Sequence, residues 1–115
     1  MMKRSAVAAI AMLTLLTPWG SASAQEALTG AKIKALFPGN YEIVVYGFKL
    51  ALTGSKGGGL NIRFDNDKDT GRWSVKGNQL CIMLKEWADG QTGCAPVSYD
   101  GKTWYNAAGV RFRRR

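Results

Sequence analysis

The sequence predicts a mainly β fold: a small antiparallel up-and-down barrel or curled sheet of about seven or eight strands, with one short N-terminal helix. Two observations predict it. Beyond residue 40, most segments alternate apolar and polar side chains, which is the period of a strand with one buried face. Tight-turn dipeptides such as Gly77-Asn78 and Asp100-Gly101 separate these segments at short intervals. Closure into a barrel buries the apolar face and removes exposed edges, and a flatter β-sandwich is the alternative.

The N-terminal segment has the pattern of a cleavable secretory signal. Two positive charges within the first four residues precede an apolar run over residues 6–16, and residues 22–24 supply an A-x-A cleavage site. The run is shorter than the ~20 residues that cross a bilayer, so an uncleaved membrane anchor is the weaker alternative. The sequence thus predicts a signal peptide over 1–24 and a single β-rich domain over 25–115, periplasmic or secreted, with no transmembrane segment.

The predicted helix covers residues 27–37. Ile33, Leu36 and Phe37 lie at i, i+3 and i+4, which makes one apolar stripe. Thr29 can cap the start of the helix, and Pro38-Gly39 ends it.

The predicted strands follow the helix, and Trp73 and Trp104 are expected in the core. A flexible glycine-rich turn (54–59), a polar connection (65–71) and a long loop (85–93) separate some of them. The strands cover residues 41–46, 48–53, 60–64, 72–76, 79–84, 94–99, 102–105 and 110–113.

The two cysteines, Cys81 and Cys94, are predicted to form a disulfide, because an exported chain meets an oxidising compartment. They would join two adjacent strands if they face each other across a hairpin. Their separation of 13 residues corresponds to ~3 kcal/mol in the chain-entropy model. A metal pair or a redox pair is the alternative, but the chain has no C-x-x-C motif and no histidine.

Charge favours an anionic partner. The formal net charge is +8, and +6 remains after the predicted signal is removed. Such a domain attracts anionic lipid, lipopolysaccharide, acidic glycans or an acidic protein, while nucleic acid is not expected in this compartment. The alternative is that the charge serves solubility, because the basic residues are scattered along the chain. Only the C-terminal residues Arg111, Arg113, Arg114 and Arg115 are concentrated.

A series of motifs extends over most of the chain after residue 24. It consists of residues 28–39 (LTGAKIKALFPG), residues 71–81 (GRWSVKGNQLC), Cys94 and residues 100–105 (DGKTWY). The series resembles an uncharacterised family of small exported β-rich domains of Gram-negative bacteria, and it is made mainly of turn and core residues. The resemblance implies a periplasmic β-domain; it implies no activity and no functional residues.

Two loops have some features of ligand sites. Asp65, Asp67 and Asp69 alternate as calcium ligands can, but an EF-hand needs Gly and Glu where this chain has Thr70 and Lys76. A solvated hairpin turn is therefore favoured, and no metal is expected. The glycine-rich residues 54–59 lack the order of a Walker loop, so a hairpin tip is favoured there, with Lys56 as a weak anion contact. No cofactor is expected.

The pattern of reactive residues argues against an enzyme. Without histidine, Ser-His and Cys-His chemistry is excluded in its usual form. Glu42 and Glu86 could act as a glycosidase pair, but nothing in the sequence places them together.

The leading interpretation is a non-enzymatic binding domain for an anionic partner at the envelope. Aromatic and basic side chains together can contact anionic groups. The candidate binding residues are Trp87 and Lys85 in the long loop and Arg111, Arg113, Arg114 and Arg115, although the last three could form a frayed tail.

Two alternatives remain open. A protein inhibitor of an exported hydrolase, such as a protease or lysozyme, would insert the loop of residues 85–93 as a rigid element. A carrier of a small apolar ligand would need a hollow barrel, whereas side chains are expected to fill a barrel with so few strands.

Overall fold

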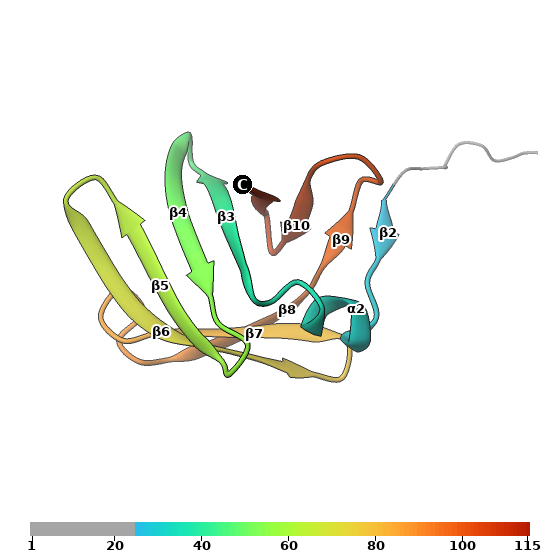
Figure 1. The fold of residues 1–115 in the computed structure, drawn as a ribbon, viewed down its shortest axis with the longest axis horizontal. Coiled ribbons are helices and arrows are strands. Elements are labelled where there is room, and N and C mark those ends of the chain that lie inside the picture. The colour runs from blue at the N-terminus through green and yellow to red at the C-terminus, as the bar shows by residue number, and fades with distance from the viewer. Residues whose placement is uncertain (1–24) are drawn as a thin grey trace, which may run out of the picture.

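The computed structural model describes residues 25–115, so the predicted signal peptide over 1–24 lies outside the described residues. The described part is mainly β, with ten strands in one antiparallel, barrel-like sheet and one short helix (Figure 1). The elements are β2 (Glu26–Ala27), α2 (Gly30–Lys34), β3 (Gly39–Val45), β4 (Phe48–Gly54), β5 (Gly59–Phe64), β6 (Asp67–Lys76), β7 (Gln79–Leu84), β8 (Thr92–Pro96), β9 (Ser98–Tyr99), β10 (Tyr105–Ala107) and β11 (Val110–Arg114).

The strand order shows how the sheet nearly closes. It runs β2-β9-β10-β11-β3-β4-β5-β6-β7-β8, so the C-terminal strand β11 returns to pair with β3. Only Val97 separates β8, at one edge of this order, from β9, near the other edge. One continuous stretch of chain therefore joins the two sides of the sheet, and the sheet must curl to allow this.

The sheet has more strands than the seven or eight expected, for two local reasons. The predicted strand over 94–99 is divided at Val97, which is almost fully buried and accepts a hydrogen bond from the backbone N–H of Leu28 (2.9 Å). Glu26–Ala27 forms the additional strand β2 against β9, where a helix was expected to begin nearby.

Two-residue turns connect several strands. The predicted turn at Gly77-Asn78 is confirmed, whereas the two-residue turn predicted at Asp100-Gly101 is wrong, because residues 100–104 separate β9 from β10. Gly77, the first residue of its turn, has φ +62°, which glycine adopts without strain. Tyr46 and Asp65 also begin turns with positive φ (51° and 53°). Strand β3 therefore ends at Val45, one residue before the predicted end at Tyr46. The predicted polar connection over 65–71 is wrong, because only Asp65 and Asn66 turn and β6 already begins at Asp67.

The last hairpin, β10–β11, begins three residues later than predicted. Asp100 Oδ1 accepts hydrogen bonds from the backbone N–H groups of Lys102, Thr103 and Trp104 (2.8–3.1 Å). These contacts hold residues 101–104 out of the sheet, so the strand predicted over 102–105 is found as β10, beginning at Tyr105.

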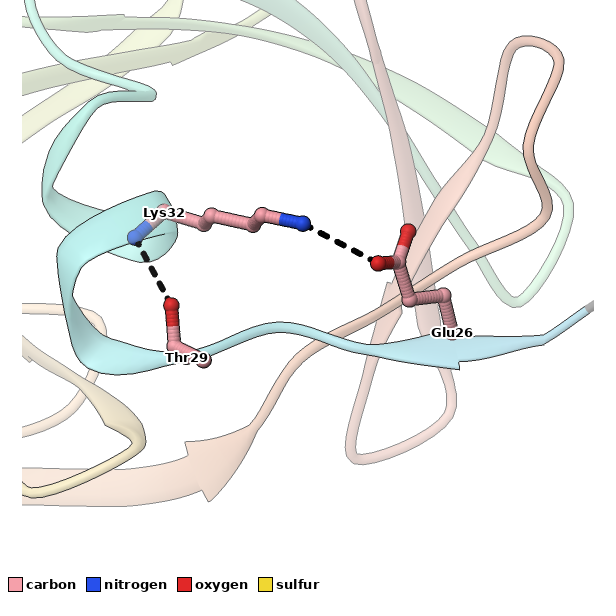
Figure 2. A network of polar contacts seen from close by, with 3 residues as sticks. All are labelled: Glu26, Thr29 and Lys32. Carbon is pink, nitrogen blue, oxygen red and sulfur yellow. Dashed lines mark hydrogen bonds and ion pairs between the residues drawn. The ribbon is translucent and has the colours of Figure 1, made fainter.

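Helix α2 is shorter than predicted, and the predicted cap is confirmed. The backbone N–H of Lys32 donates to Thr29 Oγ1 (3.3 Å), and the Lys32 ammonium pairs with Glu26 (3.0 Å) (Figure 2). Gly30 begins the helix against the β6–β7 turn, where its N–H donates to Asn78 Oδ1 (2.8 Å). A Cβ at residue 30 would lie 2.2 Å from the carbonyl oxygen of Gly77, so this approach requires glycine.

Aromatic rings form a continuous column inside the barrel. Phe37, just after α2, stacks on Trp73 (ring centroids 4.4 Å apart) and meets Tyr41 edge-on (5.9 Å). Tyr41 in turn meets Phe112 (5.6 Å). The column continues with Phe112–Tyr105 (5.1 Å) and Tyr105–Tyr99 (4.5 Å). Side chains thus fill much of the interior, and Trp73 lies in the core as predicted.

Candidate functional site

The outer face of the sheet is strongly cationic. Apolar residues such as Leu50 and Leu52 occupy alternate positions inside the barrel, so the residues between them face outward. This outer face comprises the outward positions of strands β3–β7 and β11, together with Lys85, which follows β7, and Arg115, which follows β11. These positions hold nine basic side chains and one carboxylate, that of Glu42. The basic residues are Lys49, Arg63, Lys68, Arg72, Lys76, Lys85, Arg111, Arg113 and Arg115.

Glu42 neutralises only part of this charge. Its Oε1 accepts from Arg113 Nε (2.8 Å) and pairs with Nη2 (2.7 Å), and Lys49 lies 3.8 Å from Oε2. The hydrogen bond from Arg113 holds the pKa of the Glu42 carboxyl below its usual value. Within residues 25–115, none of the other seven basic side chains of this face forms an ion pair. The face therefore keeps a large positive excess.

A groove of about 720 Å³ crosses this face over β4, β5 and β6. Arg63, Lys68 and Arg115 supply its positive charge. Its polar, uncharged wall comes from Thr53, Asn61 and Thr70, which are aligned across the three strands. Two acidic residues also line the groove, Asp69 of β6 and Glu86 at the start of the loop after β7, so three basic residues face two acidic ones there.

The loop after β7 is held firmly to the barrel. Asp69 is a buried, inward-facing residue of β6, and its Oδ2 accepts from the backbone N–H groups of Glu86 (3.0 Å) and Trp87 (2.9 Å). Burial raises the pKa of the Asp69 carboxyl, but these donors, the N–H of Thr70 and the charge of Lys85 together hold it below its usual value. The loop thus presents the Trp87 side chain, which is 40 % exposed, from a fixed backbone.

The four C-terminal arginines do not act as one cluster. Arg111 and Arg113 lie over the ring of Trp104 (4.2 and 5.0 Å to the centroid), so Trp104 is half-buried on the outer side and the prediction that it is core is wrong. Arg114 belongs to the inner register and donates to the carbonyl of Leu36 (3.2 Å). A strand sends neighbouring residues to opposite faces, which separates Arg114 from the others.

The end of the chain is also not a frayed tail. The backbone N–H of Arg115 donates to the carbonyl of Asn40 (2.9 Å), which continues the β11–β3 ladder. Arg114 lies over the ring of Tyr41 (5.0 Å). Burial raises the pKa of Tyr41 to about 12, although the Arg114 charge opposes the shift.

The predicted candidate residues are thus distributed over four places. Arg111 and Arg113 lie at Trp104, Arg114 is partly exposed and contacts Leu36 and Tyr41 from the inner register, and Arg115 lines the groove. Lys85 and Trp87 lie in the loop after β7. Four strands, β3 to β6, separate β11 from β7, which leads to Lys85 and Trp87.

Five basic residues of the outer face were missed by the sequence interpretation, although a signal for them exists. They occupy alternate positions of segments 48–53, 60–64 and 72–76, whose intervening positions are mostly apolar, and the same alternation extended back from Arg72 reaches Lys68. They are Lys49, Arg63, Lys68, Arg72 and Lys76.

The two loops considered as ligand sites have structural roles. Asp65 forms a turn, and Asp69 serves the loop after β7, so this part of the chain is not one solvated hairpin turn. Over residues 25–115, no three acidic, cysteine or histidine side chains gather as metal ligands. The glycine-rich segment is fixed rather than flexible, because Trp73 donates through Nε1 to the carbonyl of Ser55 (2.6 Å) and through N–H to that of Gly58 (2.8 Å).

The predicted disulfide is confirmed. Cys81 of β7 and Cys94 of β8 lie directly opposite each other in the register and are bonded. Because β7 is the only strand partner of β8 within the described chain, the disulfide fixes the edge of the sheet.

Comparison of the chain with known protein families, with curated proteins and with solved structures finds no match. The resemblance to an exported β-rich family therefore stays a prediction. Among the described residues, no helix has the length and apolar character needed to cross a membrane.

Proposed function

We propose that this protein is a non-enzymatic, periplasmic or secreted binding domain that attaches to an anionic partner at the cell envelope through the outer face of its sheet. The observation that carries the proposal is the charge of that face. Its outward positions hold nine basic side chains and one carboxylate, Glu42, which is itself occupied by Arg113 and Lys49. Asp69 and Glu86 add two carboxylate residues at the groove, so a positive excess remains. Like charges gathered on a rigid surface attract anions over a Debye length, ~10 Å at moderate salt.

Binding to anionic surfaces as salt rises tests this function. The protein is mixed with vesicles of phosphatidylglycerol and phosphatidylcholine, with lipopolysaccharide and with a polyanionic glycan, and the bound fraction is measured. Binding to at least one anionic partner is expected, with an affinity that falls as salt rises and no affinity for phosphatidylcholine alone. Failure to bind any of them, or binding that ignores salt, contradicts the proposal.

Export is part of the proposal, and the bonded cysteine pair supports it. Mass spectrometry of the native protein is expected to give a mass that begins at Gln25 and contains no free thiol. An intact Met1 together with two free thiols would contradict export.

Inhibition of an exported hydrolase is the second candidate, and the loop after β7 favours it. The two hydrogen bonds to Asp69 Oδ2 fix the backbone at Glu86 and Trp87, so the loop could enter an enzyme's cleft at little cost in conformational entropy. Slower cleavage by envelope proteases or lysozyme on addition of the protein, and its loss in Trp87→Ala, would support this role. Unchanged hydrolase activity would reject it.

A further inference from the structure

We infer that the groove over β4, β5 and β6 binds an acidic saccharide, a sugar chain that carries carboxylate or phosphate groups. This inference rests on the proposed function and narrows it from a charged face to one site and one ligand class.

A pair of like charges marks the groove. Arg63 of β5 and Lys68 of β6 are directly opposed in the register, and both face outward. Directly opposed like charges destabilise a sheet. Elsewhere on this face Arg113 is directly opposed to Glu42 and bonded to it, but within residues 25–115 neither Arg63 nor Lys68 forms an ion pair. An anionic group between the two cations would remove this repulsion, so the pair is suited to bind one.

A third cation extends the site. Arg115 lines the same groove as Arg63 and Lys68, and its backbone is fixed by the hydrogen bond to Asn40. A ligand with more than one anionic group could therefore be held at more than one point, which a single free anion could not.

The uncharged wall of the groove suits hydroxylated ligands. Thr53 is directly opposed to Asn61, and Asn61 to Thr70, so one row of hydroxyl and amide groups crosses the three strands. These groups both donate and accept hydrogen bonds, as sugar hydroxyls do. The volume of about 720 Å³ lies within the range of small-ligand sites, ~300–1,000 Å³.

The same features argue against a bilayer surface as the ligand of this groove. Large apolar side chains that could enter a bilayer are exposed elsewhere, Tyr46 and Phe48 at the β3–β4 turn and Trp87 in the loop after β7. None of the three lines the groove, whose lining carries three basic residues and a row of hydroxyl and amide groups.

Substitution of Glu86 tests the inference in the opposite sense, because it should strengthen binding. The Glu86 carboxylate lines the groove and repels an anionic ligand, and Glu86→Gln removes this charge. The backbone N–H of Glu86, which holds the loop to Asp69, is unchanged by this substitution.

Calorimetric titration with defined oligosaccharides tests the site. The probes are oligogalacturonate, phosphorylated maltohexaose and unmodified maltohexaose, with phosphatidylglycerol vesicles as a separate arm. The groove variant is Arg63→Gln/Lys68→Gln. Its matched control is Arg72→Gln/Lys76→Gln, which removes the same charge from exposed outward positions of β6 that do not line the groove.

Binding of at least one acidic probe and no binding of the neutral one are expected. The groove variant should lose affinity about tenfold or more and the control only about threefold or less, since a bond to a charged group is worth at least a factor of ten. The groove variant should unfold at the same or a higher temperature than the native chain, because a repulsion has been removed, so its loss of binding cannot be ascribed to misfolding.

Three results would overturn the inference. Equal losses in the two double variants would show that the whole face acts through its charge. Binding to vesicles but to neither acidic oligosaccharide would assign the face to lipid. Both results leave the proposed function standing, whereas no binding to any anionic probe would contradict both.

Discussion

The two ends of the barrel are built from similar residues and packed very differently. At the end covered by α2, Ile33 and Tyr41 are 0 % exposed and Phe37 is 7 % exposed. At the opposite end, Tyr46 is 93 % and Phe48 is 55 % exposed, although Phe48 occupies an inward position of β4. The difference follows from the presence of α2, because a barrel this small hides its apolar residues only where another element covers its mouth.

The two ends therefore differ in role: the covered end contributes most to stability, and the open end exposes apolar side chains to solvent. The aromatic column and the helix make the covered end the main source of buried apolar area. At the other end, the ring of Phe48 meets that of Phe64 (5.4 Å) and is otherwise largely open to solvent. Changes at the open end should therefore cost little stability, and this end can adapt to contacts with other molecules.

Truncation of one phenylalanine at each end tests directly whether the two ends differ in stability. Phe37→Ala should lower the free energy of unfolding by about 3–5 kcal/mol, because it leaves a cavity between Trp73 and Tyr41. Phe48→Ala should cost less than about 1 kcal/mol, because its side chain is already half exposed. Urea unfolding of both variants measures the difference, and equal costs would show that the two ends are equally important.

The disulfide tests whether packing alone holds the edge of the sheet. Cys81→Ser/Cys94→Ser should lower the free energy of unfolding by about 3 kcal/mol, from the loop that the bond closes. Hydrogen exchange should increase most in β8, whose only strand partner within residues 25–115 is β7. Unchanged protection of residues 92–96 would mean that β8 is held without the bond.

Much of the fold could be predicted because it depends on local chemistry. Alternation places apolar residues inside, Gly77-Asn78 turns, Thr29 caps the helix, and the cysteines meet across a hairpin. One error arose where distant contacts decide the structure: residues 67–71 are polar, yet pairing with β5 and β7 makes them strand. Another has a local cause, because the Asp100 side chain binds the backbone N–H groups of residues 102–104 and keeps them out of β10.

The site was less predictable than the fold, because it is assembled across strands. Arg63 and Lys68 belong to different strands, and only the register opposes them. The C-terminal arginines are close together in the sequence, but strand alternation divides them between the two faces of the sheet. Applying the period of two to charges as well as to apolar residues would have found the cationic face.

The loop after β7 lies at the open end, because the registers place the end of β7 on the side where β4 begins. Acid should loosen this loop before the covered end. The folded-state pKa of Asp69 is lowered, so its stabilising contribution is present above the unfolded-state pKa and is lost as the pH falls through the folded-state value. Protonation weakens the hydrogen bonds to the N–H groups of Glu86 and Trp87. Trp87 fluorescence and hydrogen exchange of residues 85–91 should therefore change at acid pH while β3 stays protected.

Asp69→Asn is the control for this pH dependence. The amide keeps one acceptor oxygen but carries no titrating charge, so the loop should be looser at neutral pH and change little on acidification. A loop that responds to acid equally in the native chain and in Asp69→Asn would assign the effect to another group.

The smallest expected effects come from two adjacent arginines of one strand, one directed to the covered end and one to the outer face. Arg114 serves the covered end, through the carbonyl of Leu36 and the ring of Tyr41, so Arg114→Gln should cost about 1 kcal/mol of stability and leave anion binding nearly unchanged. Arg115 faces the groove, so Arg115→Gln should leave stability within about 0.5 kcal/mol and weaken binding of an acidic oligosaccharide. Both variants are measured by unfolding and by titration. A loss of stability in Arg114→Gln and a loss of binding in Arg115→Gln would show that the strand directs the two side chains to opposite faces. The same result from both variants would mean that the end of β11 acts as one undivided basic segment.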